Sequence, residues 1–324
     1  MTAWLLRRCA AAVAIVFAVV TLTFILIHLA PGTPFLPGPE RAFDPAASAR
    51  LERQFGLDRP LPEQFARYLG QLVHGNLGDS FSQHRPVSDA LAEAVPNTLV
   101  LAGSALVLDF VVGIALGIYL AARARRASAA LVDQVTLFFY SLPTFWLGMV
   151  LLLVFSVWLR WLPAGGITDS VVYPSLNAWG RIGDRIWHLI LPAATLGLVG
   201  AAGTARFQRA ALLEVLHGEF IRTARAKGLR ERRVLLVHAL RNALLPVITL
   251  FGLALPFLLT GAVLIETVFS WPGLGKLAVD AIFARDYPLV VAAAILASVT
   301  VAGGSLVADV LYAAADPRIR VIGT

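Results

Sequence analysis

Hydrophobic and polar positions follow one another along this chain in long blocks. Six apolar stretches cover residues 9–30, 97–122, 131–160, 187–206, 243–270 and 288–312. A membrane-spanning helix needs about 20 largely apolar residues, so each stretch is long enough to cross a bilayer. The third and fifth stretches are longer than that, and we expect them to be tilted or to include a loop. The pattern predicts an all-α polytopic membrane protein with six transmembrane helices.

Composition agrees with this class. Hydrophobic residues make up 58% of the 324 residues and charged residues 15%, whereas soluble proteins carry about 25% charged residues. The formal net charge of +7 does not indicate nucleic-acid binding, because the basic residues lie in the segments between the apolar stretches. The single cysteine, Cys9, excludes an internal disulfide and a cysteine-based metal site.

The first apolar stretch follows Arg7 and Arg8, as the core of a signal peptide would. Its 22 residues exceed the roughly 7–15 residues of such a core, and no small-x-small cleavage site follows it. We therefore expect a retained N-terminal helix.

Basic residues orient the chain across the membrane, because cytoplasmic segments carry an excess of Lys and Arg. With a cytoplasmic N-terminus, the inner segments hold 16 of the 27 Lys and Arg residues, and longer outer segments hold the other 11. We predict cytoplasmic termini and three parts: an N-terminal helix (1–31), an extracytoplasmic lobe (32–95) and a core membrane domain (96–324). Within the lobe, residues 46–55 and 61–73 have helical spacing.

The most strongly charged segment is the inner loop at about 207–242. Nine Lys and Arg lie between Arg206 and Arg241, against three acidic residues. The stretch 219–246 reads EFIRTARAKGLRERRVLLVHALRNALLP. It predicts a short helix, a glycine turn and a second helical run over 230–245.

The short helix has charges that suit its dipole. Glu219 lies in the first turn, and Arg225 and Lys227 lie in the last, where a carboxylate and cations respectively are stabilised. Gly228 follows, free to adopt the left-handed conformation that ends a helix. Glu219 and Arg222 are three residues apart and are expected to pair.

Phe220, Ile221 and Ala224 fall on a small apolar face of this helix. Such an elbow suits docking into a groove on a partner protein. It equally suits a basic loop on anionic lipid headgroups. The residues alone leave both interpretations open.

The stretch resembles the cytoplasmic EAA loop of ABC importer permeases, and FIRTARAKGL…HALRNALLP resembles the dipeptide/oligopeptide/nickel branch. Arg222-Thr223-Ala224 stands where the general motif has Glu-Ala-Ala, and Gly228 stands at the motif glycine. Arg-Thr in place of Glu-Ala and the late Leu245-Pro246 depart from the general motif, but both are usual in this branch. The segments QFGLDRPLPEQFARYL, GNLGDSFSQHRPV and ETVFSWPGLG resemble the same branch.

This resemblance implies a bacterial inner-membrane permease subunit of an ATP-driven importer that works with a substrate-binding protein. Its implied partners are a second permease subunit, two ABC ATPase subunits that carry ATP-Mg, and an extracytoplasmic binding protein. It implies that this chain binds no cofactor or metal itself. The implied ATPase-coupling residues are Glu219, Phe220, Arg222, Thr223, Ala224, Arg225, Lys227 and Gly228. We expect Ala224 and Gly228 to matter because a close dock leaves no room for bulk.

Three residues are candidates for the translocation path. Asp109 lies near the middle of the second stretch, where a bare carboxylate is costly. It is either a path group that meets a substrate amine or cation, or a protonated or hydrogen-bonded packing residue. Pro143 breaks the third stretch and either lines the path or only shapes the bundle. Glu266, near the end of the fifth, either reaches the path or sits at the membrane interface.

Helix contacts can also be anticipated around the second stretch. Pro96 is expected to open it, with Asn97 or Thr98 as a cap. Gly113 and Gly117 form a GxxxG pair that lets a neighbouring helix approach closely. His188 is expected to have a packed or interfacial role rather than to bind a metal.

The sequence lacks the patterns of a catalyst. Gly275-Lys276 is followed by Leu277, and Ser270 stands where a P-loop would have its first glycine. No hydrolase triad or metal-hydrolase motif is found, so we expect a transport subunit rather than an enzyme. The alternative is an ion-coupled transporter using Asp109 and Glu266, but such folds usually show paired broken helices in two repeats. Whether the solute is a peptide, nickel or another small molecule is left open.

Overall fold

The computed structural model describes residues 2–29, 50, 53, 56–248, 250–251 and 262–315, and the side chains of all these except 2–6 and 307–315. The described part of the chain is built of helices, with one isolated β-bridge between Asp79 and Pro86, which confirms the predicted all-α class. The chain divides into two compact units. One comprises Met1–Pro96 with Lys276–Val299, and the other Asn97–Gly275 with Thr300–Thr324.

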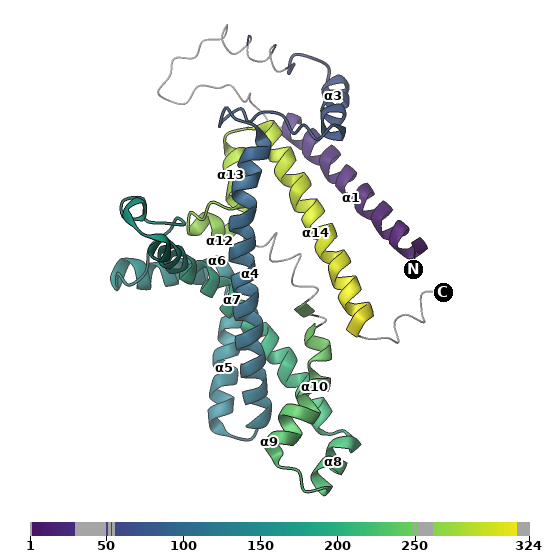
Figure 1. The fold of residues 1–324 in the computed structure, drawn as a ribbon, viewed down its shortest axis with the longest axis vertical. Helices are drawn as coiled ribbons and strands as arrows, with labels where there is room; N and C mark the ends of the chain where they lie inside the picture. Colours follow the sequence, from purple (N-terminus) through teal and green to yellow (C-terminus); the bar gives the residue numbers. More distant parts are fainter. Residues whose placement is uncertain are drawn as a thin grey trace. The chain divides into compact units, whose positions relative to one another are not determined.

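Three helices run from one unit into the other: α4 (Val87–Ala122), α13 (Leu274–Phe283) and α14 (Tyr287–Ala315). The first unit also holds α1 (Thr2–Leu29) and α3 (Leu61–Val73). The second holds α5 (Ala127–Ser141), α6 (Thr144–Leu151), η1 (Leu152–Trp158), η2 (Tyr173–Ser175), α7 (Ala178–Leu216), α8 (Glu219–Ala226), α9 (Glu231–Arg233), η3 (Val234–Ala239), α10 (Leu240–Ala243) and α12 (Val263–Val268) (Figure 1).

Four helices among the described residues are long and apolar enough to cross a membrane: Arg7–Leu29, Val87–Ala122, Ala178–Leu216 and Tyr287–Leu306. A fifth span results if Ala127–Ser141 and Thr144–Trp158, bent by 104° at their break, count as one. Residues 252–261 of the predicted fifth stretch lie outside the described residues. The number six therefore stays a prediction, as does the division at residues 31 and 95.

Two long helices begin earlier than their apolar stretches. α4 starts at Val87 and contains Pro96, so the prediction that Pro96 opens this helix is wrong. α7 starts at Ala178, where the Asn177 side chain accepts a 2.8 Å hydrogen bond from the Gly180 amide. In both cases the apolar run indicated only the segment that suits the bilayer, and the helix continues through more polar residues.

In the first unit, α1 packs on α3 through aromatic side chains. Phe24 is 7% exposed, and its ring centroid lies 5.1 Å from that of Phe65 and 6.3 Å from that of Tyr68. Burial raises the pKa of Tyr68 to about 12. The His28 ring and the Gln64 side chain are 3.1 Å apart. Helix α3 covers residues 61–73 as predicted.

A buried carboxylate fixes the segment before α4 to the start of α14. Asp286 is fully buried, and its Oδ2 accepts hydrogen bonds from Ser80 Oγ (2.5 Å), Ser82 Oγ (2.7 Å) and the Ser82 amide (2.9 Å). Its Oδ1 accepts one from the Leu289 amide at 3.3 Å. Asp286 thus caps α14 and holds residues 80–82 to it.

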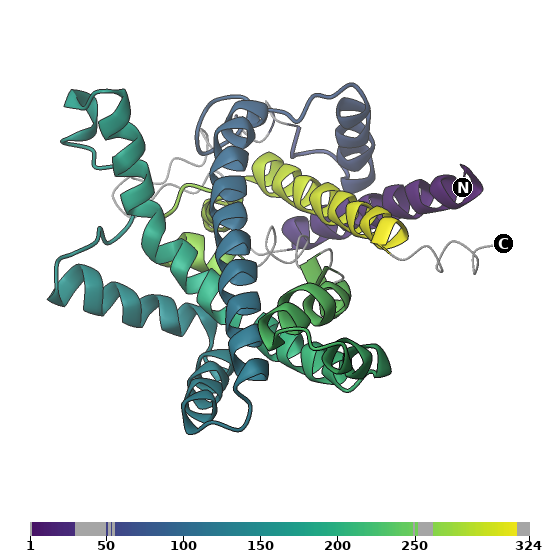
Figure 2. The same cartoon turned by 60° about the horizontal axis from the view of Figure 1, so that its bottom comes forward.

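In the second unit, α7 crosses α4 (Figures 1 and 2), and glycines line the contact between the two helices. A Cβ added at Gly113 would lie 2.6 Å from Thr204 Cβ, and one at Gly117 would lie 2.6 Å from Gln208 Cβ. Gly197 of α7 is equally close to Leu108. The predicted close packing at the GxxxG pair is confirmed, and it makes α7 the neighbour of α4.

Candidate functional site

The basic elbow consists of α8, a glycine turn and α9 with η3. Gly218 is the N-cap of α8. At the other end Gly228 has φ +77°, the left-handed conformation that favours glycine. The predicted short helix with its glycine stop is confirmed. A Cβ at Gly228 would meet nothing within 4 Å, so inside this chain the backbone conformation, and not lack of space, calls for glycine there.

One face of α8 is buried inside the chain. Ile221 is fully buried and Ala224 is 7% exposed, and they pack in one cluster with Leu212, Val234 and Ala239. Ala224 is therefore covered by this chain itself, and the expectation that it matters for a close dock with a partner stays a prediction. Its small side chain lets α8 lie close to α7 and η3, whereas Phe220 on the other side is 48% exposed.

The exposed face of α8 is polar and mainly basic. Arg222 Nη1 lies 2.8 Å from Glu219 Oε1, which confirms the predicted pair. The structure adds a second pair, since Arg225 donates two hydrogen bonds to Glu231 at 2.6 and 3.2 Å. The hydrogen bonds from Arg225 lower the pKa of Glu231, and they raise that of Arg225. This pair crosses the glycine turn, so helical spacing did not reveal it.

The helical run after the turn is not regular. It begins as α9, continues as the π-helical η3 and returns to α-helix in α10. A π-turn inserts an extra residue and often marks a functional site. Here it places Val234 and Ala239, both fully buried, against α8.

The C-terminal half of α7 also contacts α5. Arg209 Nη1 lies 2.6 Å from Asp133 Oδ2, and the Arg206 guanidinium lies 5.7 Å from the centroid of the Tyr140 ring. α7 thus contacts α4, α5 and the elbow at its C-terminal half. A displacement of α8 would therefore act on α7, which is itself in contact with α4 and α5.

Asp109 lies in the α4–α7 seam. Its Oδ1 accepts a 2.7 Å hydrogen bond from Thr204 Oγ1. A Cβ at Gly200 would lie 2.5 Å from its Oδ2. The residues next to Asp109 in the sequence offer no hydrogen-bond partner, and the structure supplies Thr204. This contact favours the packing interpretation of Asp109.

Pro143 stands at the break between α5 and α6. Leu142 and Pro143 have extended backbone angles, with ψ of 138° and 128°, and the two helical segments meet at 104°. Phe138, Tyr140, Phe145 and Trp146 around the break are each more than 40% exposed in this chain.

Glu266 is fully buried within the second unit. Its Oε1 accepts a 2.7 Å hydrogen bond from Thr98 Oγ1, which in turn accepts one of 2.7 Å from the Leu274 amide. Gly273 and Gly275 lie against the Glu266 carboxylate too closely for any Cβ. The carboxylate therefore fixes the turn between α12 and α13.

Asn97 completes this arrangement. Its side chain donates to the Pro272 carbonyl at 2.8 Å, and its own carbonyl accepts from Trp271 Nε1 at 2.9 Å. Asn97 and Thr98 thus hold the 271–274 turn and do not cap α4, contrary to expectation. The signal that was missed is a pair of polar residues on one turn of an otherwise apolar helix.

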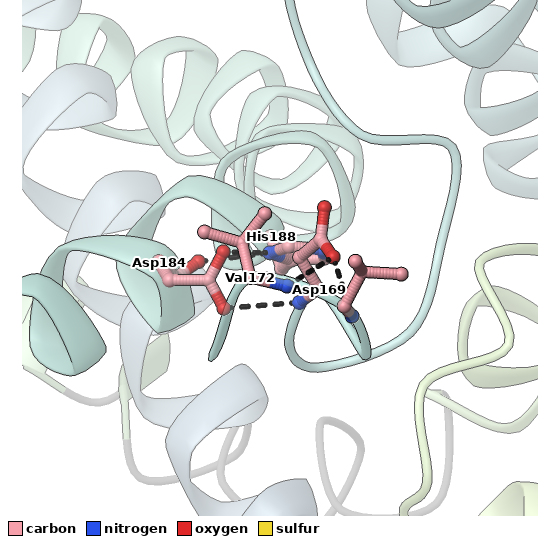
Figure 3. Close-up of polar contacts among 5 residues, drawn as sticks. Asp169, Val172, Asp184 and His188 are labelled. Atoms are coloured by element: carbon pink, nitrogen blue, oxygen red, sulfur yellow. Dashed lines mark hydrogen bonds and ion pairs between the residues drawn. The ribbon is translucent and has the colours of Figure 1, made fainter. Parts of the chain in front are cut away.

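A loop before α7 carries the remaining polar cluster (Figure 3). The Asp169 Oδ1 accepts hydrogen bonds from the Val171 and Val172 amides at 2.8 and 3.0 Å, and mainly the one from Val172 lowers the pKa of Asp169. Asp184 Oδ2 accepts from the Asp169 amide at 3.0 Å, and His188 Nδ1 donates to the Asp184 carbonyl at 2.8 Å. His188 is packed, as predicted, and the cluster fixes the loop to α7.

Among the described residues, no group of three or more His, Cys, Asp or Glu side chains is placed to hold a metal ion. Long apolar helices, a glycine seam and a basic helical elbow in the described part of the chain together define a polytopic α-helical membrane protein.

Comparison with known proteins gives the family. Residues 113–321 match the family described as binding-protein-dependent transport system inner membrane component, and residues 1–102 match its N-terminal membrane component. The chain belongs to this family of permeases.

Similarity to individual permeases extends over 99% of this chain. The oligopeptide transport system permease protein AppB of Bacillus subtilis is 40% identical over 321 residues, which are 99% of this chain and 100% of the relative. The di/tripeptide transport system permease protein DppB of Pseudomonas aeruginosa is 41% identical over 333 residues, 99% of each chain. The glutathione transport system permease protein GsiC of Escherichia coli is 40% identical over 322 residues, again 99% of each.

The fold is similar to that of a chain in an inward-facing structure of the MetNI methionine ABC transporter. The TM-score is 0.55 at 19% identity, over 70% of this chain and 96% of that chain. At this identity the likeness concerns the fold alone.

Proposed function

We propose that this chain is the membrane-spanning permease subunit of an ATP-driven importer of short peptides. The observation that carries the proposal is its similarity over 99% of its length to permeases named for oligopeptides, di- and tripeptides and glutathione. A second permease subunit would complete the path, and an extracytoplasmic binding protein would deliver the peptide. Two ABC ATPase subunits would bind ATP-Mg, and both termini of this chain would lie in the cytoplasm.

The exposed face of α8 is the proposed docking surface for an ATPase subunit. It carries Phe220, Arg222, Thr223, Arg225 and Lys227, all exposed. Ile221 and Ala224 fix the opposite face to α7 and η3. A push on α8 would therefore be transmitted to the 39-residue α7 instead of being absorbed by a mobile loop. Glu219 orients Arg222, and Gly228 permits the turn.

The break at Pro143 is the proposed path element of the second unit, because exposed aromatic rings surround it. Asp109 lies in the α4–α7 seam and is a weaker candidate, since Thr204 already occupies one of its oxygens. The full burial of Glu266 favours a structural part for this residue.

The docking proposal is tested by paired cysteine labelling. Cys9 is the only cysteine, so Cys9→Ser supplies the background. Thr223→Cys places a thiol on the exposed face of α8, and Ala224→Cys places one on the adjoining buried face. In membranes, a water-soluble maleimide should label position 223, and co-assembled ATPase should protect it. Position 224 should react slowly in both states.

Two results would contradict the docking proposal. One is labelling of position 223 only from outside sealed cells, which would put the elbow on the wrong side of the membrane. The other is equal labelling with and without the ATPase.

The transport proposal needs a separate measurement. The assembled complex in proteoliposomes should accumulate a labelled tripeptide only with ATP and binding protein, and an ionophore should not stop it. Uptake that needs no ATP but collapses with the ionophore would replace this proposal with ion-coupled transport. ATP-driven uptake of nickel without peptide would change the substrate only.

A further inference from the structure

The first unit contains a cavity of about 310 Å³ at the ends of two long apolar helices. Leu26 and Ile27 of α1, Val290 of α14 and Ile282 of α13 give it apolar walls, and Arg285 and Tyr287 line it beside them. Its volume is at the lower end of the range of small-molecule sites, about 300–1,000 Å³. It therefore has room for part of a molecule with an apolar chain.

Arg285 supplies a cation for which the described residues provide no counter-ion. Its Nη1 is buried and has no hydrogen-bond partner, and no ion pair of Arg285 is found within the described residues. The carboxylate of the neighbouring Asp286 forms no ion pair with Arg285 and instead accepts hydrogen bonds from Ser80, Ser82 and the Leu289 amide. Guanidinium groups bind phosphate oxygens through paired N–H donors. The charge of the site thus calls for an anion.

The surroundings indicate where such an anion would come from. Leu22, Ile25, Leu26 and Leu29 on α1 are 45–69% exposed in this chain, as expected for a helix that faces lipid. The cavity lies where α1 ends, at Leu29, and just where α14 begins, at Tyr287. The ends of membrane-spanning helices lie at headgroup level, and Tyr is enriched there. An occupant can therefore enter from the bilayer with its phosphate at Arg285 and its chain along Leu26, Ile27 and Val290.

We propose that this cavity binds an anionic phospholipid, with the phosphate on Arg285 and an acyl chain between α1 and α14. The site is independent of the proposed peptide transport and requires only the folded subunit in a membrane. A bound lipid would fill the space between the two helices and stabilise their contact.

The test uses the purified full-length chain, by native mass spectrometry and by thermal unfolding in detergent with added lipid. Phosphatidylglycerol and phosphatidylcholine with identical acyl chains are the probes. We expect a preference for phosphatidylglycerol in the unchanged protein. Arg285→Gln should weaken its binding by about tenfold or more, because hydrogen bonds to charged groups are stronger than neutral ones. Arg67→Gln removes the same charge from an exposed position, 54% accessible, and should change little.

A second variant tests the acyl-chain part. Ile27→Trp fills the cavity and should reduce the binding of both lipids. If Arg285→Gln does not fold, two measurements on the unchanged protein still decide the question. One is its preference for phosphatidylglycerol, and the other is whether bound phosphatidylglycerol protects Arg285 from reaction with phenylglyoxal. Equal binding of the two lipids, or equal loss in the Arg285 and Arg67 variants, would overturn the proposal.

Two further outcomes would replace the lipid with another occupant. Inorganic phosphate that stabilises the lipid-free protein as well as phosphatidylglycerol does would make this a site for free anions. Loss of lipid binding on assembly with the second permease subunit, together with cross-linking of that subunit to position 27, would make it a subunit interface.

Discussion

The glycine seam between α4 and α7 supports a quantitative test with an internal control. An Ala side chain at Gly117 would bring its Cβ to 2.6 Å from Gln208 Cβ and 2.8 Å from the Ala205 carbonyl oxygen. Gln208 is fully buried and cannot move aside into solvent. At Gly103, on the same helix, a Cβ would meet nothing within 4 Å. Gly117→Ala and Gly103→Ala therefore make the same chemical change with and without a steric conflict.

The difference between the two variants isolates the seam. Ala is preferred over Gly inside a helix by about 1 kcal/mol, and both variants gain this term. Overpacking at Gly117 should cost about 1–3 kcal/mol. Gly103→Ala should therefore be stabilised by about 1 kcal/mol. The free energy of unfolding of Gly117→Ala should be about 1–3 kcal/mol below that of Gly103→Ala. Relative to the unchanged protein, this means anything from no net change to a loss of about 2 kcal/mol.

The assay is reversible unfolding of the purified subunit in mixed micelles with increasing dodecyl sulfate. Helical circular dichroism and the fluorescence of the seven tryptophans would report the transition. Equal midpoints for the two variants, at equal slopes, would show that α4 and α7 are not in close contact at Gly117. A lower midpoint for Gly103→Ala would mean that the packed face of α4 has been assigned wrongly.

Three further predictions concern buried and paired carboxylates. Thr98→Val removes a hydrogen bond to the Glu266 carboxylate, worth about 1.5–3 kcal/mol, and takes the acceptor from the Leu274 amide of α13, at about 1–3 kcal/mol, so the free energy of unfolding should fall by about 2.5–6 kcal/mol. Because Arg225 lowers the pKa of Glu231, their pair stabilises the elbow above the ordinary glutamate pKa of about 4.3 and loses its effect as pH falls through the lowered value. Amide exchange in α8 should therefore become faster at acid pH, by an amount that corresponds to at most about 1 kcal/mol because the pair is exposed. Glu231→Gln should abolish this pH dependence. Asp286→Asn should speed amide exchange at residues 80–82 and leave α3 unchanged.

Each of these has an outcome that would count against it. Thr267→Val is the control for Thr98→Val, because the Thr267 hydroxyl is exposed and donates to the Val263 carbonyl within α12. Equal stability of the two variants would show that the hydrogen bond from Thr98 to Glu266 does not stabilise the fold. An acid dependence that persists in Glu231→Gln would assign it to another group. Unchanged exchange at residues 80–82 in Asp286→Asn would show that other contacts hold this segment.

Sequence by itself was sufficient for features that depend on neighbouring residues. Helix 61–73, the short helix from Glu219, its stop at Gly228 and the Glu219–Arg222 pair were all predicted and confirmed. The membrane-spanning class followed from the lengths of the apolar runs. These features are local, because helix periodicity, end charges and glycine backbone preferences act within a few residues.

Features that depend on distant residues were decided by the tertiary structure. Thr204 lies 95 residues from Asp109, and Thr98 lies 168 residues from Glu266, so neither hydrogen bond has a signature in a single sequence. The same holds for the burial of Ala224 on α7 and η3. An apolar run shows that a segment avoids water, but it cannot show whether lipid, a partner or the same chain covers each face. Only the folded chain distinguishes these surroundings.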